Sequence, residues 1–369
     1  MVTRIFGISF VVSAAALVVA FLYGGPQALI LAAVLGIFEV SLSFDNAVIN
    51  ATVLQRMDEF WQKMFLTVGI LIAVFGMRLV FPLAVVWITA GLDPVQAIHI
   101  ALNPPADGAA HFPDGSPSYE TALTAAHPQI AAFGGMFLMM LFLNFIFSER
   151  EITWLSWLER PLGRAGKLDQ LAVVVALGAL LASAEFLVDE EHVPTVLFAG
   201  VLGLGSYILI DGLGAMFNVD EGGEEAESAG PSNLVKATGK AAFFLFLYLE
   251  VLDASFSFDG VIGAFAITSD PIIIALGLGF IGAMFVRSIT IFLVRKGTLS
   301  DYVYLEHGAH WAIGALAVIL LISLGIHVDE ILTGLIGVVL IAAAFISSII
   351  RNRRAAGSDA ESPSSVLTN

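Results

Sequence analysis

The chain has 369 residues, of which 58% are hydrophobic and 13% are charged, and its formal net charge is −16. Polytopic helical membrane proteins have this composition, and soluble globular proteins rarely do. The acidic balance argues against nucleic acid as a partner, and the absence of cysteine excludes disulfides, thiolate metal sites and cysteine nucleophiles. We therefore expect an all-α polytopic membrane protein with the lipid bilayer as its main partner.

Apolar runs predict about 10 transmembrane helices, because each run approaches the ~20 residues that cross the hydrocarbon core. The first run follows Arg4 and resembles a signal peptide, but no small-residue cleavage site follows it, so we interpret it as a span. The predicted spans are 5–23, 27–53, 64–90, 130–147, 169–188, 195–215, 240–267, 272–294, 309–326 and 331–350.

These spans predict a single transmembrane domain over residues 1–350. Its longest predicted connections are an outer loop over 91–129 and an acidic loop over 216–236. We expect the acidic loop to be cytoplasmic and solvated. The polar residues 351–369 predict a disordered cytoplasmic tail.

The basic residues predict the orientation of the chain. If both termini are cytoplasmic, the cytoplasmic segments contain 14 of the 16 lysines and arginines, and the outer loops contain none. The remaining two, Arg78 and Arg287, fall inside spans. This distribution follows the positive-inside rule. We therefore predict a multi-pass protein of the plasma membrane with both termini in the cytoplasm.

Two polar stretches interrupt the apolar runs and resemble each other. Aligning "SFDNAVI" with "SFDGVIG" places Asp45 on Asp259, and one of the two intramembrane arginines follows each stretch. Spans 2-3 (repeat one, about 27–90) therefore recur as spans 7-8 (repeat two, about 240–294). The odd offset of five spans predicts an inverted-topology repeat. Such repeats, with polar helices at matching positions, are typical of transporters with a substrate site near the bilayer midplane.

Helical spacing distributes the polar residues of these stretches over two faces. Asp45 and Asp259 lie on a different face from most of the other polar residues. Either both faces are used, or the helices unwind near Asn46 and Gly260, which are poor helix formers. The shared stripes are Glu39, Ser43, Asn46 and Asn50 in the first stretch, and Glu250, Asp253, Ser257 and Gly260 in the second.

Energetics exclude lipid as the environment of these side chains. An ionised group at a helix centre costs roughly 3 kcal/mol, so the five acids and two arginines would cost on the order of 20 kcal/mol if unpaired. Using Arg78 and Arg287 as charge-balancing partners for two acids leaves three carboxylates. Carboxylate, amide and hydroxyl oxygens suit Mg²⁺, Ca²⁺ or Mn²⁺. The structural alternative is a set of buried polar contacts that lock the helices together.

A third polar cluster, "EHGAH", contains Glu306, His307 and His310. These side chains could form a metal site or a proton relay at the cytoplasmic side. Capping and solvation at a cytoplasmic helix start are the favoured interpretation.

At the paired motifs the sequence resembles the TerC family of membrane proteins (tellurium-resistance protein C). The hallmark of that family is a pair of intramembrane motifs, E…S-x-D-N and E-x-x-D…S-x-D-S. The resemblance covers the motif spans and the helices that follow them, while Gly260 in place of serine and the long outer loop depart from it. The motifs read Glu39…Ser43-Phe44-Asp45-Asn46 and Glu250-Val251-Leu252-Asp253…Ser257-Phe258-Asp259-Gly260.

The resemblance implies a divergent branch of the lysine-exporter-like transporters, which are implicated in export of metal ions, chiefly manganese, and by name in tellurium resistance. It implies secondary export of a divalent cation, with Mn²⁺ as the expected substrate and Ca²⁺ or Mg²⁺ as alternatives, and no organic cofactor. The implied ion contacts are Asp45, Asn46, Asp253 and Asp259, supported by Glu39, Ser43, Glu250 and Ser257.

Two other functions compete with export. The first is a membrane assembly or stress-complex scaffold of the TerC type, in which the polar sites are structural. The second is an intramembrane aspartyl protease, but the G-x-G-D signature of those enzymes is absent. We therefore expect no enzymatic activity.

Overall fold

The computed structural model describes most of the chain. Within the described part, every element longer than an isolated β-bridge is a helix. This confirms the predicted all-α fold class for those residues. The described residues are 2–69, 71–72, 76, 80, 83–84, 87, 93–105, 109–221, 236–265, 267–268, 270–295, 302–328 and 330–360.

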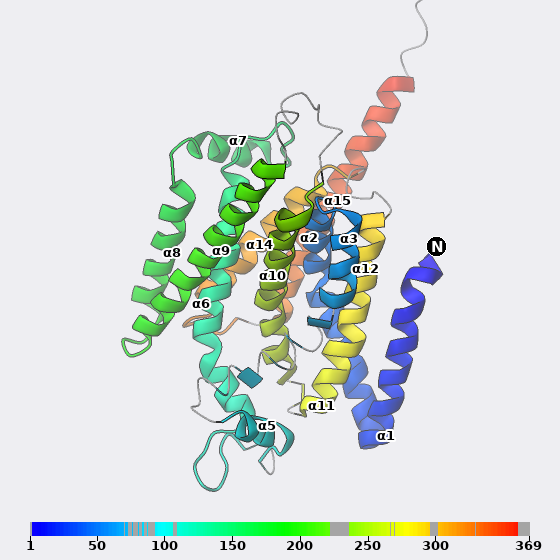
Figure 1. Cartoon of the computed structure of the whole chain (residues 1–369), viewed down its shortest axis with the longest axis vertical. Coiled ribbons are helices and arrows are strands. Elements are labelled where there is room, and N and C mark those ends of the chain that lie inside the picture. The colour runs from blue at the N-terminus through cyan, green and yellow to red at the C-terminus, as the bar shows by residue number, and fades with distance from the viewer. Residues whose placement is uncertain are drawn as a thin grey trace, which may run out of the picture.

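The long helices lie side by side in one bundle (Figure 1). Among the elements bounded within the described residues, η1 and η4 are π-helical. The elements are α1 (Val2–Leu42), α2 (Phe44–Leu54), α3 (Glu59–Met64), η1 (Phe65–Gly69), α5 (Pro94–Leu102), α6 (Tyr119–Ile146), α7 (Ser156–Ala165), α8 (Leu171–Leu187), α9 (Val193–Glu221), α10 (Gly239–Phe265), α11 (Pro271–Ile274), η4 (Ala275–Gly282), α12 (Ala283–Arg295), α14 (Leu305–Ile322) and α15 (Glu330–Ala360).

Six helical stretches among the described residues are long and apolar enough to cross a membrane. Large apolar side chains point outward from the bundle, including Phe186 at 81% exposed and Leu22 at 77% exposed. Water would be a poor solvent for such a surface, whereas lipid tails suit it. A multi-pass membrane protein is therefore supported. The six stretches are Ile5–Val40, Tyr119–Ile146, Val193–Leu213, Pro271–Val294, Leu305–Ile322 and Leu335–Arg354.

The first helix, α1, reverses its direction at Gly24 and Gly25. Gly25 has φ 69° and ψ −157°, a conformation that favours glycine because a Cβ would be strained there. The first arm runs antiparallel to the segment from α11 to α12. Near its start, the Ser9 hydroxyl bonds to that of Ser288 in α12 at 2.7 Å, and near its end, the Tyr23 hydroxyl donates to Asp270, just before α11, at 3.0 Å. The second arm returns up the bundle (Figure 1). The reversal lies between the first two predicted apolar runs, and the second of these runs comprises the second arm of α1 and also α2.

The second arm of α1 packs closely on η4 through small residues. Ala28, Ala32 and Gly36 recur every four residues and therefore share one face of the helix. A Cβ at Gly36 would lie 2.5 Å from a methyl carbon of Ile281, and one at Gly277 would lie 2.9 Å from the Ala32 carbonyl oxygen. Small residues let two helix backbones approach in this way, which is how membrane helices associate without a hydrophobic driving force between them.

Helices α2 and α10 run antiparallel to each other, and this pairing positions the candidate site. Just beyond the end of α2, Asp58 N–H donates to the Ala237 carbonyl at 3.0 Å, and Ala237 N–H donates to the Arg56 carbonyl at 2.8 Å. Because Ala237 lies two residues before the start of α10, the end of α2 meets the start of α10. Deeper in the bundle, a side-chain bond between Asn46 and Asp253 joins the same two helices.

The predicted outer loop over 91–129 contains more helix than expected. It includes α5 and the first turns of α6. The start of α5 is a capping box, in which the Asp93 carboxylate accepts from Val95 and Gln96 N–H while the Gln96 side chain accepts from Asp93 N–H. Pro94 at the first helical position favours the same start.

The predicted disordered tail over 351–369 is wrong in its first ten residues, because α15 continues to Ala360. Arginine is a good helix former, so the helix extends through Arg351, Arg353 and Arg354 beyond the apolar run. Likewise, α9 extends to Glu221, inside the predicted loop 216–236. Residues 222–235 and 361–369 lie outside the described part of the chain.

The close contact between α1 and η4 gives a stability prediction. We expect Gly277→Ala to lower the free energy of unfolding by about 1–3 kcal/mol, because its Cβ would overlap the Leu35 side chain. Gly178→Ala in α8 is the matched control, since nothing lies within 4 Å of a Cβ there. Thermal unfolding in detergent, followed by circular dichroism, measures both variants. A Gly277→Ala protein that melts at or above the wild-type temperature would contradict this packing.

Candidate functional site

The structure brings the two sequence motifs together inside the bundle. Asn46 on α2 donates its side-chain N–H to the Asp253 carboxylate on α10 at 2.7 Å. Both side chains are buried, although 207 residues separate them in the sequence. A hydrogen bond to a carboxylate in a buried setting contributes more than an ordinary one. Two of the four expected ion-contacting residues therefore meet directly.

Glu39 and Ser43 form a second contact within the first motif. The Ser43 hydroxyl donates to the Glu39 carboxylate at 2.7 Å, and Glu39 is only 1% exposed. Ser43 lies at the junction of α1 and α2 with φ −95° and ψ 16°, but its N–H still donates to the Glu39 carbonyl at 2.8 Å. The first motif therefore contains one irregular residue rather than an unwound segment. In the second motif α10 is continuous through Gly260, so the predicted alternative of an unwound helix near Gly260 is wrong.

Glu250 is the least satisfied polar side chain in the described part of the site. It is 7% exposed, and neither of its carboxylate oxygens has a hydrogen-bond partner among the described residues. The side-chain oxygen of buried Asn50 also lacks one there. Because α2 and α10 are antiparallel, Asn50 and Glu250 both lie about one turn from the Asn46–Asp253 bond, on the same side of it. Burying a bare carboxylate costs free energy, so this position favours the binding of a proton or a cation.

Two π-helical segments, which the sequence analysis missed, border the motif acids. A Cβ at Gly69, the last residue of η1, would lie 2.7 Å from a carboxylate oxygen of Glu250. A Cβ at Gly282, the last residue of η4, would overlap the Glu39 side chain. Each glycine thus lets an acid lie against a helix backbone. π-Helical turns are rare and frequent at functional sites. The glycine-rich run "LGLGFIG" was the available sequence signal for η4.

Arg287, predicted to balance charge, reaches across to the other π segment. Its Nε–H donates to the Leu66 carbonyl in η1 at 2.9 Å. The side chain therefore connects α12 to the segment that borders Glu250. Its pairing with a carboxylate stays a prediction, and Arg78 lies outside the described residues.

Three predicted ligands lie outside what the structure describes: the side chains of Asp45, Ser257 and Asp259, on α2 and α10. Among the described residues no group of three or more acidic or histidine side chains is positioned to hold a metal ion. The described part of the site contributes two carboxylates and two amides from the facing helices: Glu250, Asp253, Asn46 and Asn50.

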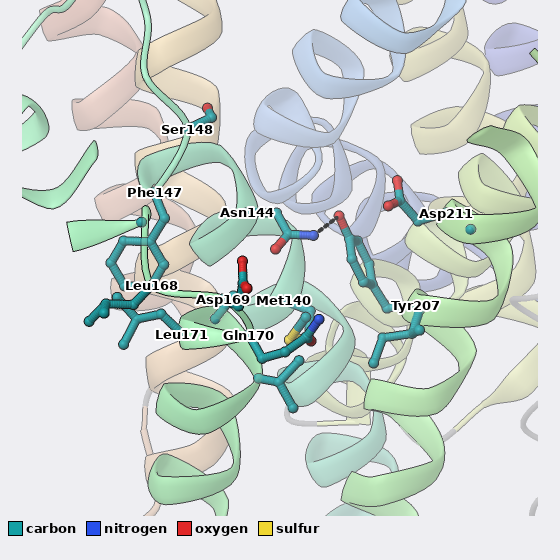
Figure 2. A pocket seen from close by; sticks show the side chains of 15 residues that line it. Met140, Asn144, Phe147, Ser148, Leu168, Asp169, Gln170, Leu171, Tyr207 and Asp211 are labelled. Carbon is teal, nitrogen blue, oxygen red and sulfur yellow. Dashed lines mark hydrogen bonds between the residues drawn. The ribbon is translucent and has the colours of Figure 1, made fainter. Parts of the chain in front are cut away.

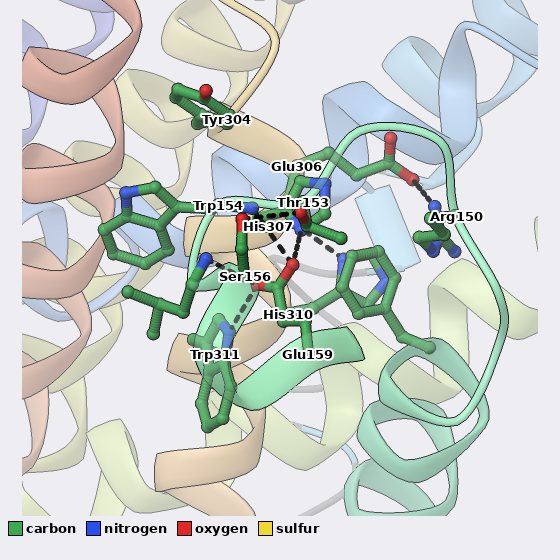
Figure 3. A network of polar contacts seen from close by, with 12 residues as sticks. Arg150, Thr153, Trp154, Ser156, Glu159, Tyr304, Glu306, His307, His310 and Trp311 are labelled. Carbon is green, nitrogen blue, oxygen red and sulfur yellow. Dashed lines mark hydrogen bonds and ion pairs between the residues drawn. The ribbon is translucent and has the colours of Figure 1, made fainter. Parts of the chain in front are cut away.

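A separate buried network surrounds "EHGAH" and corrects the expectation of capping and solvation there. His307 and His310 are both buried (Figure 3). Glu159 on α7 accepts from Trp154 N–H at 3.0 Å and from the Trp311 indole N–H at 3.1 Å. Nδ1 of His307 lies 3.0 Å from the same carboxylate, as in an ion pair, without the alignment of a hydrogen bond. Nothing in the sequence marked Glu159 as buried, because it lies in a polar segment.

Charged residues close this network at the end of the bundle. Glu306 forms ion pairs with Arg56 at 3.1 Å and with Arg150 at 3.6 Å. The Phe145 ring contacts both a cation and a second ring. The Arg150 guanidinium carbon lies 3.8 Å from the centre of the Phe145 ring, and the His310 ring stacks on it with the two ring centres 3.7 Å apart. Burial lowers the pKa of Arg150, against the opposing effect of Glu306. The cluster ties α14 to the segment between α6 and α7.

A cavity of about 430 Å³ lies between α6, α8 and α9, apart from the two motifs (Figure 2). Asn144 donates to the Tyr207 hydroxyl at its wall at 3.0 Å, and Asp169 and Asp211 also line it. It contains none of the residues predicted to bind an ion.

The bond between the motif helices gives a second prediction. In a double-mutant cycle, Asn46→Ala and Asp253→Ala should show a coupling free energy of about 1–3 kcal/mol, because each single change removes the same buried, charge-assisted bond. Thermal unfolding of the four proteins in detergent measures it. The control cycle pairs Asn46→Ala with Asp114→Ala in the exposed segment between α5 and α6, where the effects should add. Additive effects for Asn46 and Asp253 would contradict the bond.

Comparison with known proteins gives a family without a function. Residues 44–355 match the model of a family described as "Protein of unknown function (DUF475)". This range includes Phe44, Asp45 and Asn46 of the first motif and the whole of the second. No curated protein and no solved structure matches the chain. Because the match covers well over half of its 369 residues, the chain belongs to the DUF475 family.

Proposed function

We propose that the protein is a secondary transporter that exports a divalent metal cation, with Mn²⁺ as the expected substrate, through a site between α2 and α10. The observation that carries this proposal is the Glu250 carboxylate, buried and without a hydrogen-bond partner among the described residues. It lies beside the bond that joins the two motifs. A buried acid in this state favours a position where a cation binds and leaves.

The donor atoms fit a hard divalent ion. Glu250, Asp253, Asn46 and Asn50 supply carboxylate and amide oxygens, which Mn²⁺, Mg²⁺ and Ca²⁺ accept. We propose that Asp45 and Asp259 complete the coordination from the same two helices. Glu39, Ser43 and Ser257 would support these ligands, and Arg78 and Arg287 would balance the remaining charge.

We also propose the predicted architecture of ten spans, in which spans 2-3 and 7-8 form inverted repeats. The following observations support it. Helices α2 and α10 are antiparallel, each is followed in the chain by a π segment, and a glycine of each π segment lies against an acid of the opposite motif. The reversal within α1 separates the first two predicted spans. Such repeats provide two similar halves that rock about a central site.

The same carboxylate supplies a means of coupling. A cation arriving at Glu250 would displace any proton there, and loss of the cation would allow a proton to return. A proton gradient would then drive export, because a divalent ion and protons exchange at one position. The membrane potential would add to this drive if more than two protons entered for each ion exported. No phosphate-binding loop sequence of the P-loop type is present in the chain.

The resemblance to TerC supports the same class of function, and we propose that this DUF475 protein is a divergent relative of that family. A scaffold of the TerC type is the second candidate. The observation that favours it is the Asn46–Asp253 bond, because a buried bond between distant helices also stabilises a bundle without any transport.

The proposed orientation places both termini in the cytoplasm of a cell with this protein in its plasma membrane. In the structure Val2 and Ala360 lie toward the same end of the bundle, opposite α5 (Figure 1). The chain has no cysteine, so single introduced cysteines can be labelled without background. We expect a membrane-impermeant maleimide to label Ser116→Cys, between α5 and α6, in intact cells, and Arg353→Cys only after lysis. The reverse pattern would contradict the orientation.

Transport itself is tested by Mn²⁺ flux in proteoliposomes under a proton gradient or a membrane potential. We expect wild-type flux to fall by about tenfold or more in Asp45→Asn, Asp259→Asn and Glu250→Gln, because each change removes a charge that would hold the ion. Asp114→Asn is the control, because Asp114 is an exposed acid that bonds to Ser116 away from the bundle.

The outcomes separate the two candidate functions. Flux that depends on the motif acids, in proteins that unfold at the wild-type temperature, supports export. An absence of flux for Mn²⁺, Ca²⁺ and Mg²⁺ in the wild type, together with lowered stability of the motif variants, supports the scaffold.

A further inference from the structure

Helix α7 presents an exposed face of mixed aromatic, basic and apolar residues. We call it the α7 face, and its residues are Trp157, Arg160, Pro161 and Arg164. Their spacing of three, four and seven residues from Trp157 places them on one side of the helix. Trp157 is 77% exposed, and Leu168, three residues beyond the end of α7, is 65% exposed.

The opposite face of α7 is fixed to the bundle. Glu159 is buried and accepts hydrogen bonds from Trp154, Leu155 and Trp311 (Figure 3). Gly163 is buried against the segment after α6, where a Cβ would lie 3.3 Å from the Ser148 carbonyl oxygen. The α7 face therefore points away from the protein in a defined orientation.

A cavity of about 360 Å³ lies between α7 and the end of α6, and Arg150, Arg160 and Arg164 line it. Three acids also line it, but two are already engaged: Glu159 by its donors, and Glu149 by Lys167 at 3.1 Å. The third, Glu151, is exposed. Among the described residues neither Arg160 nor Arg164 forms an ion pair, so this edge of an otherwise acidic protein offers two arginines to an anion.

The position of α7 identifies the kind of anion. The helix lies across the ends of α8 and α9 rather than along them (Figure 1). It follows the end of the apolar helix α6 and precedes the apolar helix α8, so it lies where hydrocarbon gives way to headgroups. Tryptophan is enriched at that level, and arginine pockets on the cytoplasmic side bind anionic headgroups.

We propose that the α7 face binds an anionic phospholipid of the cytoplasmic leaflet. The headgroup phosphate lies at Arg160 and Arg164, at the mouth of the cavity, and the acyl chains pass Trp157 and Leu168. This lipid site involves none of the motif residues and stands independently of cation export.

The test uses purified, delipidated full-length protein in detergent and native mass spectrometry. Phosphatidylglycerol and phosphatidylcholine with identical acyl chains are titrated in turn. We expect the wild type to bind phosphatidylglycerol more tightly than phosphatidylcholine by about tenfold or more, since each arginine contributes to the attraction. Arg160→Gln/Arg164→Gln should abolish this preference, and Arg160→Lys/Arg164→Lys should keep most of it.

The matched control is Arg353→Gln/Arg354→Gln, which removes the same charge from two exposed arginines of α15 and should leave the preference intact. Millimolar inorganic phosphate should not displace the lipid. The proposal is overturned if the preference survives Arg160→Gln/Arg164→Gln, if the control loses it equally, or if phosphate competes, since the site would then take a soluble anion.

Discussion

The hydrogen bond from Asn46 to Asp253 is the contact on which the centre of this molecule depends. It lies in a buried region of a bundle with an apolar outer surface, where a charged or polar group must find a partner or be excluded. By joining α2 to α10 it brings together the two matching stretches in which carboxylates and amides interrupt long apolar runs. Glu250 and Asn50 are buried beside it as a consequence, since antiparallel helices place them at the same level.

The two π segments extend this arrangement to the neighbouring helices. Gly69 and Gly282 remove a side chain where an acid must approach the backbone, so the motif acids contact η1 and η4 without a clash. This arrangement is reciprocal: the acid of each motif lies against the segment that follows the other motif. Under the proposed inverted repeat, contacts of this kind in both halves would suit a change between two states.

The sequence predicted the helical class, the breaks between the first two apolar runs and the convergence of Asn46 with Asp253, because apolar run length and paired motifs are strong local signals. It could not predict the π segments, because their wider i→i+5 hydrogen bonding depends on tertiary packing. It also placed His307 and His310 in solvent, because burial there comes from Glu159 and α7, which are distant in sequence. Asp93 and Gln96 have the spacing of a capping box and could have predicted the start of α5, but this segment was assigned to a loop.

Equilibrium Mn²⁺ binding would show whether the buried acids between α2 and α10 hold a divalent ion. The paramagnetic signal of free Mn²⁺, followed during titration of the purified protein, reports binding without any need for transport. We expect saturable binding by the wild type and by Asp114→Asn, and an affinity weakened about tenfold or more in Glu250→Gln, which loses a carboxylate ligand. Equal affinity in Glu250→Gln and the wild type would contradict this expectation.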